Sequence, residues 1–429
     1  MPKSPKIRLR DRASSQPVIR LMIGFQLFFG LLLWTPIFFE YQRQLGISVA
    51  DILAIQSIYY VAFCLLEIPT GMIADRIGYR RCMLAGGAVL VVSNVMPVSV
   101  PSYWGFLVHF LLIALARSLV SGASSAYLYE FMAANGEREQ YKQAEGSARS
   151  YSLVGKVVGW PLVGLAMQWE MTLPYWLTAV SAVLAVVMAY RLPPLPDSVR
   201  KPTEDPLAGS SISRAPVITS VRESLGLLRR TPMLLLFMAQ GVAVFTLGRI
   251  CQVNLFQPIL TADSVPLVAH GMVMSAMSVF EALGSARPGI IRRFLTDSRA
   301  VFVLTVVMAG TLALTVPGNG VATIAALCVF ALAMGLSFPI QRQLINDAIP
   351  PTPYRATLLS IESIIDRGVC ALVALALGSY LAEGALAEFL LLSAGASVAL
   401  MAVLLAVLPL VRRRVTRGGE AAQEVLSAP

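Results

Sequence analysis

Charged residues inside long apolar stretches are the side chains of this chain best suited to chemistry. Glu362 and Asp366 are four residues apart, so they share one face of a helix, while Arg367 is rotated from Asp366 by about 100°. A carboxylate withdrawn from water inside a membrane can change its protonation state near neutral pH. We therefore expect a proton-responsive site here, with Asp366 favoured over Glu362 because it lies nearer the expected midplane. A static buried ion pair would leave the same pattern.

Five more charges interrupt apolar stretches, namely Glu67, Arg117, Lys156, Arg249 and Glu281. A charge at bilayer depth costs at least about 2.5 kcal/mol unless it meets a partner or water, so Arg117 is not expected to face lipid. Lys156 lies too far from the headgroups for an easy return, so we expect it to reach the interior of its helix bundle. Glu281 is the rival proton-responsive acid, and Arg249 and Arg367 are candidate counter-ions.

Membrane-spanning helices are needed to position these side chains. Of 429 residues, 56% are hydrophobic and only 14% are charged, and the mean hydropathy of +0.70 is too high for a water-soluble protein. A helix needs about 20 apolar residues to cross the hydrocarbon layer. Twelve segments have roughly this length: 18–39, 50–74, 82–100, 104–131, 151–167, 172–190, 233–260, 268–286, 300–316, 321–340, 358–381 and 387–411. The expected fold class is all-α, a polytopic membrane protein with twelve transmembrane helices.

Lys and Arg concentrate in the tails and in those loops that would lie on one side of the membrane. Such residues are retained on the cytoplasmic side of short loops. The pattern predicts a multi-pass protein of a bacterial-type inner (plasma) membrane, with both termini cytoplasmic. The net charge of +10 then follows from topology and from attraction to anionic lipid of the bilayer, and nucleic acid is not an expected partner.

A stretch rich in proline, serine and glycine divides the chain near its middle. The end of this stretch has apolar residues at helical spacing, which favours an amphipathic helix on the membrane surface, although a solvated helix would look the same. The expected domains are a cytoplasmic basic tail (1–17), an N-terminal six-helix bundle (18–190), a cytoplasmic linker (191–231), a C-terminal six-helix bundle (232–411) and a cytoplasmic tail (412–429).

The loop after the second segment combines small residues, one acid and three bases. These residues are Gly71, Asp75, Arg76, Gly78, Arg80 and Arg81. Glycines let backbones approach closely, and a carboxylate such as that of Asp75 can accept hydrogen bonds from a helix N-terminus. Arginines can bind the same carboxylate or lipid phosphates. A cluster of this kind can latch one conformation of the protein.

This loop resembles the G-x-x-x-D-R-x-G-x-[RK]-[RK] signature of the major facilitator superfamily, at the loop where that family carries it. The resemblance implies two pseudo-symmetric six-helix bundles around a central cavity, which rock between inward-open and outward-open states. It also implies that Asp75 caps the eleventh helix in the outward-facing state, and Thr352 and Pro353 provide a suitable N-terminus for that helix.

The fifth segment carries small residues at regular spacing, namely Gly146, Gly155, Gly159, Pro161 and Gly164. This pattern is similar to the antiporter motif of the 12-helix drug:proton antiporter subgroup, although Trp160 stands where that motif has proline. The alternative is that small residues at this spacing only allow close helix packing.

Six polar and aromatic residues are expected to line the substrate cavity: Gln26, Phe29, Trp34, Asn254, Phe256 and Gln257. Several of them must simply be packing. Glycine-rich phosphate loops, hydrolytic triads and metal-ligand motifs are not found in the sequence, so we expect no cofactor, no metal site and no enzyme activity.

These features predict a secondary active transporter that works by alternating access, most specifically in proton-coupled efflux of small amphipathic molecules. Protons are the expected coupling ion, a small molecule is the substrate, and the protein is expected to be a monomer. A metabolite or siderophore importer or facilitator of the same fold is the alternative. A non-transporting membrane receptor or a polytopic enzyme is favoured less, because no large extramembrane domain is present.

Overall fold

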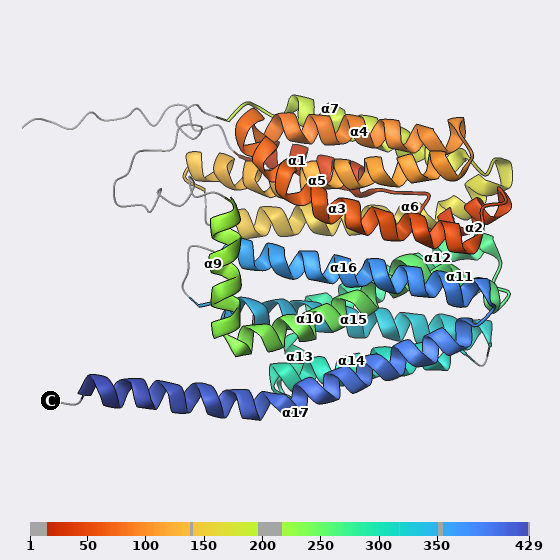
Figure 1. Ribbon diagram of the computed structural model, residues 1–429. Coiled ribbons are helices and arrows are strands. Elements are labelled where there is room, and N and C mark those ends of the chain that lie inside the picture. Colours follow the sequence, from red (N-terminus) through yellow and green to blue (C-terminus); the bar gives the residue numbers. More distant parts are fainter. Residues whose placement is uncertain (1–14, 138–139, 196–216, 317, 351–354, 428–429) are drawn as a thin grey trace, which may run out of the picture. The chain divides into compact units, whose positions relative to one another are not determined.

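The computed structural model describes residues 15–137, 140–195, 217–316, 318–350 and 355–427. Every regular element in these ranges is a helix (Figure 1). The prediction of an all-α polytopic membrane protein is confirmed. Nine helices in the described part of the chain are long and apolar enough to cross a membrane.

The described part of the first half of the chain forms seven helices. They are α1 (Gln16–Gly30), α2 (Phe38–Gln44), α3 (Val49–Ile77), α4 (Tyr79–Ser99), α5 (Tyr103–Ala134), α6 (Tyr141–Trp169) and α7 (Leu173–Arg191). The expected first span, 18–39, is interrupted, because α1 ends at Gly30 and α2 begins only at Phe38. The break contains Pro36, which cannot donate a helical hydrogen bond. The N–H of Leu33 instead donates to the hydroxyl of Thr178, 3.0 Å away.

The second half begins with a short helix and continues with longer ones. They are α9 (Val217–Arg230), α10 (Pro232–Ile250), the π-helix η3 (Cys251–Leu255), α11 (Phe256–Ala262), α12 (Leu267–Ala286), α13 (Gly289–Arg292), α14 (Asp297–Leu314), α15 (Gly320–Ala348), α16 (Arg355–Ala382) and α17 (Leu386–Ser427). Figure 1 shows α9 running across the ends of α10 and α16, which it contacts.

Packing divides the described residues into two compact units. The first contains described residues of Met1–Leu33, Leu65–Gly159 and Thr172–Asp205. In it, α4 packs on α5 and α7, and α1 packs on α7. Its core is apolar, with Phe25, Met83 and Tyr127 fully buried.

The second unit contains described residues of Trp34–Cys64, Trp160–Met171 and Pro206–Pro429. In it, α15 packs on α10, α12 and α14, while α10 also contacts α16 and α17. The crossing of α12 and α15 requires a small residue, because a Cβ at Gly335 would lie 2.1 Å from the carbonyl oxygen of Glu281. This close crossing fixes α12 against α15, and α15 in turn packs on α10. Both α10 and α15 supply partners for the charged side chains of α16.

Candidate functional site

Asp366 of α16 forms an ion pair with Arg249 of α10, with 2.8 Å between Oδ2 and a terminal guanidinium nitrogen. The Asp366 side chain is only 4% exposed, and that of Arg249 is 33% exposed. The hydroxyl of Thr246, one turn before Arg249, donates a second hydrogen bond to Asp366 at 3.3 Å. Two side chains of α10 therefore hold this one carboxylate.

Glu362 forms a second ion pair one turn earlier on α16. Its Oε2 lies 2.8 Å from a terminal nitrogen of Arg342, which belongs to α15. The Glu362 side chain is 1% exposed and that of Arg342 is 39% exposed. The two acids of α16 thus tie this helix to two different neighbours.

Arg342 lies just beyond the predicted span 321–340 and was therefore not among the predicted site residues. The structure continues α15 to Ala348, well past that boundary. The apolar pattern could have predicted the longer helix. Ile345 and Ile349 are buried, and they continue the apolar positions past residue 340.

Arg367, expected as a counter-ion, has a different neighbour. Its guanidinium carbon lies 3.7 Å from the centre of the Phe63 ring, which is cation–π geometry. The rival acid Glu281 accepts a hydrogen bond of 2.7 Å from Gln252. Gln252 belongs to the π-helix of residues 251–255, an irregularity that is frequent at functional sites.

Four of the six expected cavity residues are buried in the second unit: Trp34, Asn254, Phe256 and Gln257. The side-chain oxygen of Gln257 accepts from the N–H groups of Phe39 and Glu40, at 3.0 and 3.3 Å. Its side-chain nitrogen donates to the carbonyl of Thr35 at 3.0 Å. Gln257 therefore supports the broken backbone between α1 and α2.

Asn254 and the two cavity candidates on α1 have other neighbours. Asn254 accepts a 3.0 Å hydrogen bond from the hydroxyl of Tyr60. Gln26 and Phe29 lie half-buried on α1 in the first unit, where the Phe29 ring stacks on Phe25 at 5.4 Å.

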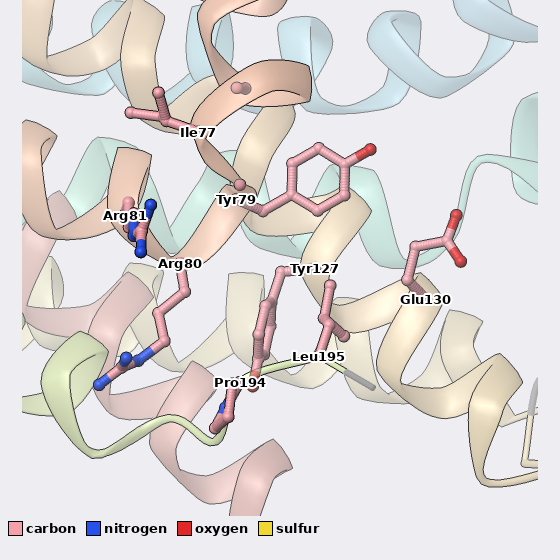
Figure 2. A pocket seen from close by; sticks show the side chains of 10 residues that line it. Ile77, Tyr79, Arg80, Arg81, Tyr127, Glu130, Pro194 and Leu195 are labelled. Atoms are coloured by element: carbon pink, nitrogen blue, oxygen red, sulfur yellow. The ribbon is translucent and has the colours of Figure 1, made fainter. Parts of the chain in front are cut away.

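The loop between α3 and α4 borders a cavity of about 230 Å³ (Figure 2). Gly78 adopts φ +94°, which favours glycine, and so lets α4 begin directly after α3. The guanidinium of Arg80 donates to the carbonyl of Tyr190 and lies 5.6 Å from the centre of that ring. The hydroxyl of Tyr127 donates to the carbonyl of Pro193 at 2.6 Å.

The other latch residues are placed only in part. Arg76 and Arg81 are exposed, and Arg81 borders the cavity. The side chain of Asp75, together with Thr352 and Pro353, lies outside the described residues. A Cβ at Gly71 would meet no atom of the described residues within 4 Å.

The small residues of α6 make close contacts at three positions. A Cβ at Gly155 would lie 2.8 Å from Leu27, and one at Gly159 would lie 2.8 Å from Leu33. A Cβ at Gly164 would lie 2.1 Å from the carbonyl oxygen of Val268. Pro161 lies inside the helix, and Gly146 has no close neighbour in the described part of the chain. The packing alternative for this motif therefore has direct structural support at these three glycines.

The remaining intramembrane charges lie in the first unit. Lys156 on α6 and Glu67 on α3 are partly buried, whereas Arg117 on α5 is exposed. One carboxylate oxygen of Glu67 is buried and has no hydrogen-bond partner among the described residues. These three charges belong to a different unit from the one that contains α16.

Solved structures of similar fold cover nearly the whole chain. A variant of nucleoside transporter NupG is 15% identical, covering 90% of this chain and 99% of that chain with a TM-score of 0.76. A peptide transporter POT variant with sulfate is 16% identical, with coverages of 93% and 95% and a TM-score of 0.69. A POT family transporter in complex with 5-aminolevulinic acid is 12% identical, with coverages of 95% and 98% and a TM-score of 0.71. At such low identity, the similarity shows the fold.

Comparison of the sequence with family models shows the family of the chain, and not only its fold. No curated protein sequence matches the chain significantly. The family model described as Major Facilitator Superfamily matches residues 21–365, which is most of the chain. The match is to the superfamily as a whole, so it supports the wider resemblance and not specifically the drug:proton antiporter subgroup. The chain belongs to the major facilitator superfamily and is a secondary transporter, not an enzyme.

Proposed function

We propose that the chain couples transport of a small amphipathic molecule to protons, and that Asp366 and Glu362 are the proton-responsive groups. The observation that carries the proposal is a pair of buried carboxylates on α16, each in an ion pair with an arginine of another helix. Buried ion pairs of this kind are strongly affected when one partner loses its charge.

Protonation would neutralise the carboxylates and weaken two helix contacts together. Asp366 connects α16 to α10, and Glu362 connects α16 to α15. A protonated acid retains its hydrogen bonds in part but loses the Coulomb attraction to arginine. The charge state of α16 therefore biases the arrangement of α10, α15 and α16, which is the coupling that proton-driven transport requires.

A transporter that works by alternating access must also be closed on the side of the membrane to which its substrate site is not open. Within the second unit, two first-half segments, Trp34–Cys64 and Trp160–Met171, pack with second-half helices. A Cβ at Gly271 of α12 would lie 2.0 Å from the carbonyl oxygen of Trp160. We name these contacts, with the Gln257 and Asn254 hydrogen bonds, the outer gate. Given cytoplasmic termini, the outer gate lies on the non-cytoplasmic side, and its contacts are formed within the second unit.

Efflux in exchange for protons is the direction predicted by the small-residue pattern in α6, and uptake together with protons is the alternative. A polar metabolite is the second candidate substrate class, since proteins of similar fold include a nucleoside transporter and peptide transporters. The proposed location is a bacterial-type inner membrane, with the protein as a monomer of two six-helix bundles joined by the linker 191–231.

The test uses the full-length protein in liposomes that contain a pH-sensitive dye. Small molecules are added with and without an imposed proton gradient, and both internal pH and compound accumulation are followed. Coupled transport predicts proton movement that depends on the compound, and compound accumulation that depends on the gradient. Transport that ignores the gradient would reject proton coupling and favour a facilitator.

A further inference from the structure

Arg342 differs from Arg249 in its surroundings. Its guanidinium carbon lies 5.1 Å from the centre of the Phe245 ring and 5.8 Å from that of Phe338. The two rings lie 4.9 Å apart at a tilt of 48°. At 39% exposure, Arg342 is also the most open of the four side chains in the two ion pairs. It is a cation bounded by aromatic rings, with part of its surface open to another group.

The open part of Arg342 is suited to water and not to hydrocarbon. A guanidinium facing lipid is costly, so a partly exposed arginine in a transmembrane helix normally faces a water-filled space or a helix end. Arg342 lies near the end of α15, the end that the charge pattern places on the cytoplasmic side. A solute arriving from the cytoplasm can therefore reach it.

Glu362 is held by fewer groups than Asp366. Among the described residues, Asp366 accepts hydrogen bonds from Arg249, Thr246 and the thiol of Cys370, whereas Glu362 accepts one from Arg342 alone. The charged groups that act on Glu362 are Arg342 of α15, Arg249 of α10 and Asp366 of its own helix. Of the two ion pairs, the one between Glu362 and Arg342 is the easier to exchange for another anion.

We propose that Arg342 binds the anionic group of the substrate, and that the substrate is an organic acid with a flat, apolar body. The inference rests on the proposed function and names the substrate class of the same site. The substrate carboxylate accepts two parallel hydrogen bonds from the guanidinium, displacing Glu362, while the apolar body packs against Phe245 and Phe338. The displaced Glu362, being buried, takes up one proton from water. The anion and the proton then occupy the site together and the charge of the site does not change, so this binding step corresponds to the alternative in which substrate and proton move in the same direction.

The experiment measures binding to the purified full-length protein in detergent by equilibrium dialysis at neutral pH. Radiolabelled benzoate, naphthalene-1-acetate and indole-3-acetate are each compared with their amides, which have the same body without the charge. At least one acid is expected to bind about tenfold more tightly than its amide, as a charge-assisted bidentate contact implies. No preference for any of the three acids over its amide would overturn the proposal.

Variants of Arg342 and Glu362 distinguish binding of the acid at this site from general electrostatic attraction of anions to the protein. Arg342→Gln is expected to remove the preference for the acid, and Arg342→Lys, which keeps the charge but loses the planar fork, to retain only part of it. Arg292→Gln is the matched control, because Arg292 is also partly exposed, at 30%, and paired to Asp297 at 2.9 Å. Glu362→Gln removes the competing carboxylate and is expected to preserve or strengthen acid binding. An unchanged preference in Arg342→Gln, or its loss in Glu362→Gln, contradicts the proposal.

The dialysis has no proton gradient, so its result is independent of coupling. A carrier that ignores protons would still prefer the acid if Arg342 binds it, and then only the proposed proton coupling would fail. Gradient-driven transport of a compound, combined with no acid preference in dialysis, would overturn the anion site alone.

Discussion

The hydroxyl of Tyr60 in α3 donates a 3.0 Å hydrogen bond to the side-chain oxygen of Asn254 in the π-helix of residues 251–255. Both side chains are buried, at 1% and 0% exposure. A hydrogen bond between buried partners is costly to leave half-made, so this contact strengthens the outer gate at an irregular point of the helix.

Tyr60→Phe is therefore expected to weaken the outer gate by about 1–3 kcal/mol, the cost of an unsatisfied buried polar group. Hydrogen–deuterium exchange of residues 251–262 should become faster than in the unchanged protein. Tyr380→Phe is the matched control, because no hydrogen bond from the Tyr380 hydroxyl is found among the described residues. Equal exchange in both variants would mean that the Tyr60 contact does not support the gate.

Asp366→Asn and Glu362→Gln are expected to reduce gradient-driven accumulation at least tenfold while substrate exchange without a gradient continues, because an amide cannot change its charge. Glu281→Gln tests the rival acid, which accepts a hydrogen bond from the neutral side chain of Gln252. We expect Glu281→Gln to keep its gradient dependence. Full gradient dependence in all three variants would exclude a carboxylate of this region as the coupling group.

The ion pair of Asp366 and Arg249 can be tested by removing one or both charges. Arg249→Leu leaves Asp366, at 4% exposure, without its cation and is expected to destabilise the protein by about 3–5 kcal/mol. Arg249→Leu combined with Asp366→Leu should recover much of this loss, since two apolar side chains replace the pair. Thermal unfolding in detergent measures both. If the free energy of unfolding of the double variant falls by the sum of the losses from the two separate substitutions, this would argue against a direct pair.

Sequence reasoning found the acids of α16 and Arg249 because buried charges are rare in apolar segments and need partners. It could not find which cation pairs with which acid, since that depends on how α10, α15 and α16 pack. Arg342 was missed because the hydropathy of the span falls after Ile340, although the helix continues. The break before α2 was missed because the N–H of Leu33 is satisfied by a side chain distant in sequence, Thr178.

The prediction that Asp75 forms a latch rests on the loop motif and on the resemblance of this motif to the signature of the major facilitator superfamily. Asp75→Asn is expected to lower the transport rate without changing surface expression or thermal unfolding, because an amide accepts hydrogen bonds from a helix N-terminus less strongly than a carboxylate. Transport in liposomes, normalised to reconstituted protein, measures the effect. Normal transport rates at normal expression would remove the latch from the mechanism.

Close packing of α12 against the Trp160–Met171 segment provides a final test of the outer gate. Gly271→Ala would place a Cβ 2.0 Å from the carbonyl oxygen of Trp160, a distance that backbone atoms cannot accept without moving apart. Such overpacking typically costs about 1–3 kcal/mol. The cost applies only while the gate is closed, so the variant should populate the gate-open state more than the unchanged protein.

Cys251 offers a native reporter, because its thiol is fully buried beside the outer gate. Gly271→Ala is expected to increase its labelling by a membrane-impermeant maleimide, detected by mass spectrometry of the peptide that contains it. Gly310→Ala is the matched control, since a Cβ at Gly310 meets no atom of the described residues within 4 Å. The same labelling of Cys251 in both variants would mean that the contact between Gly271 and Trp160 does not hold the gate closed.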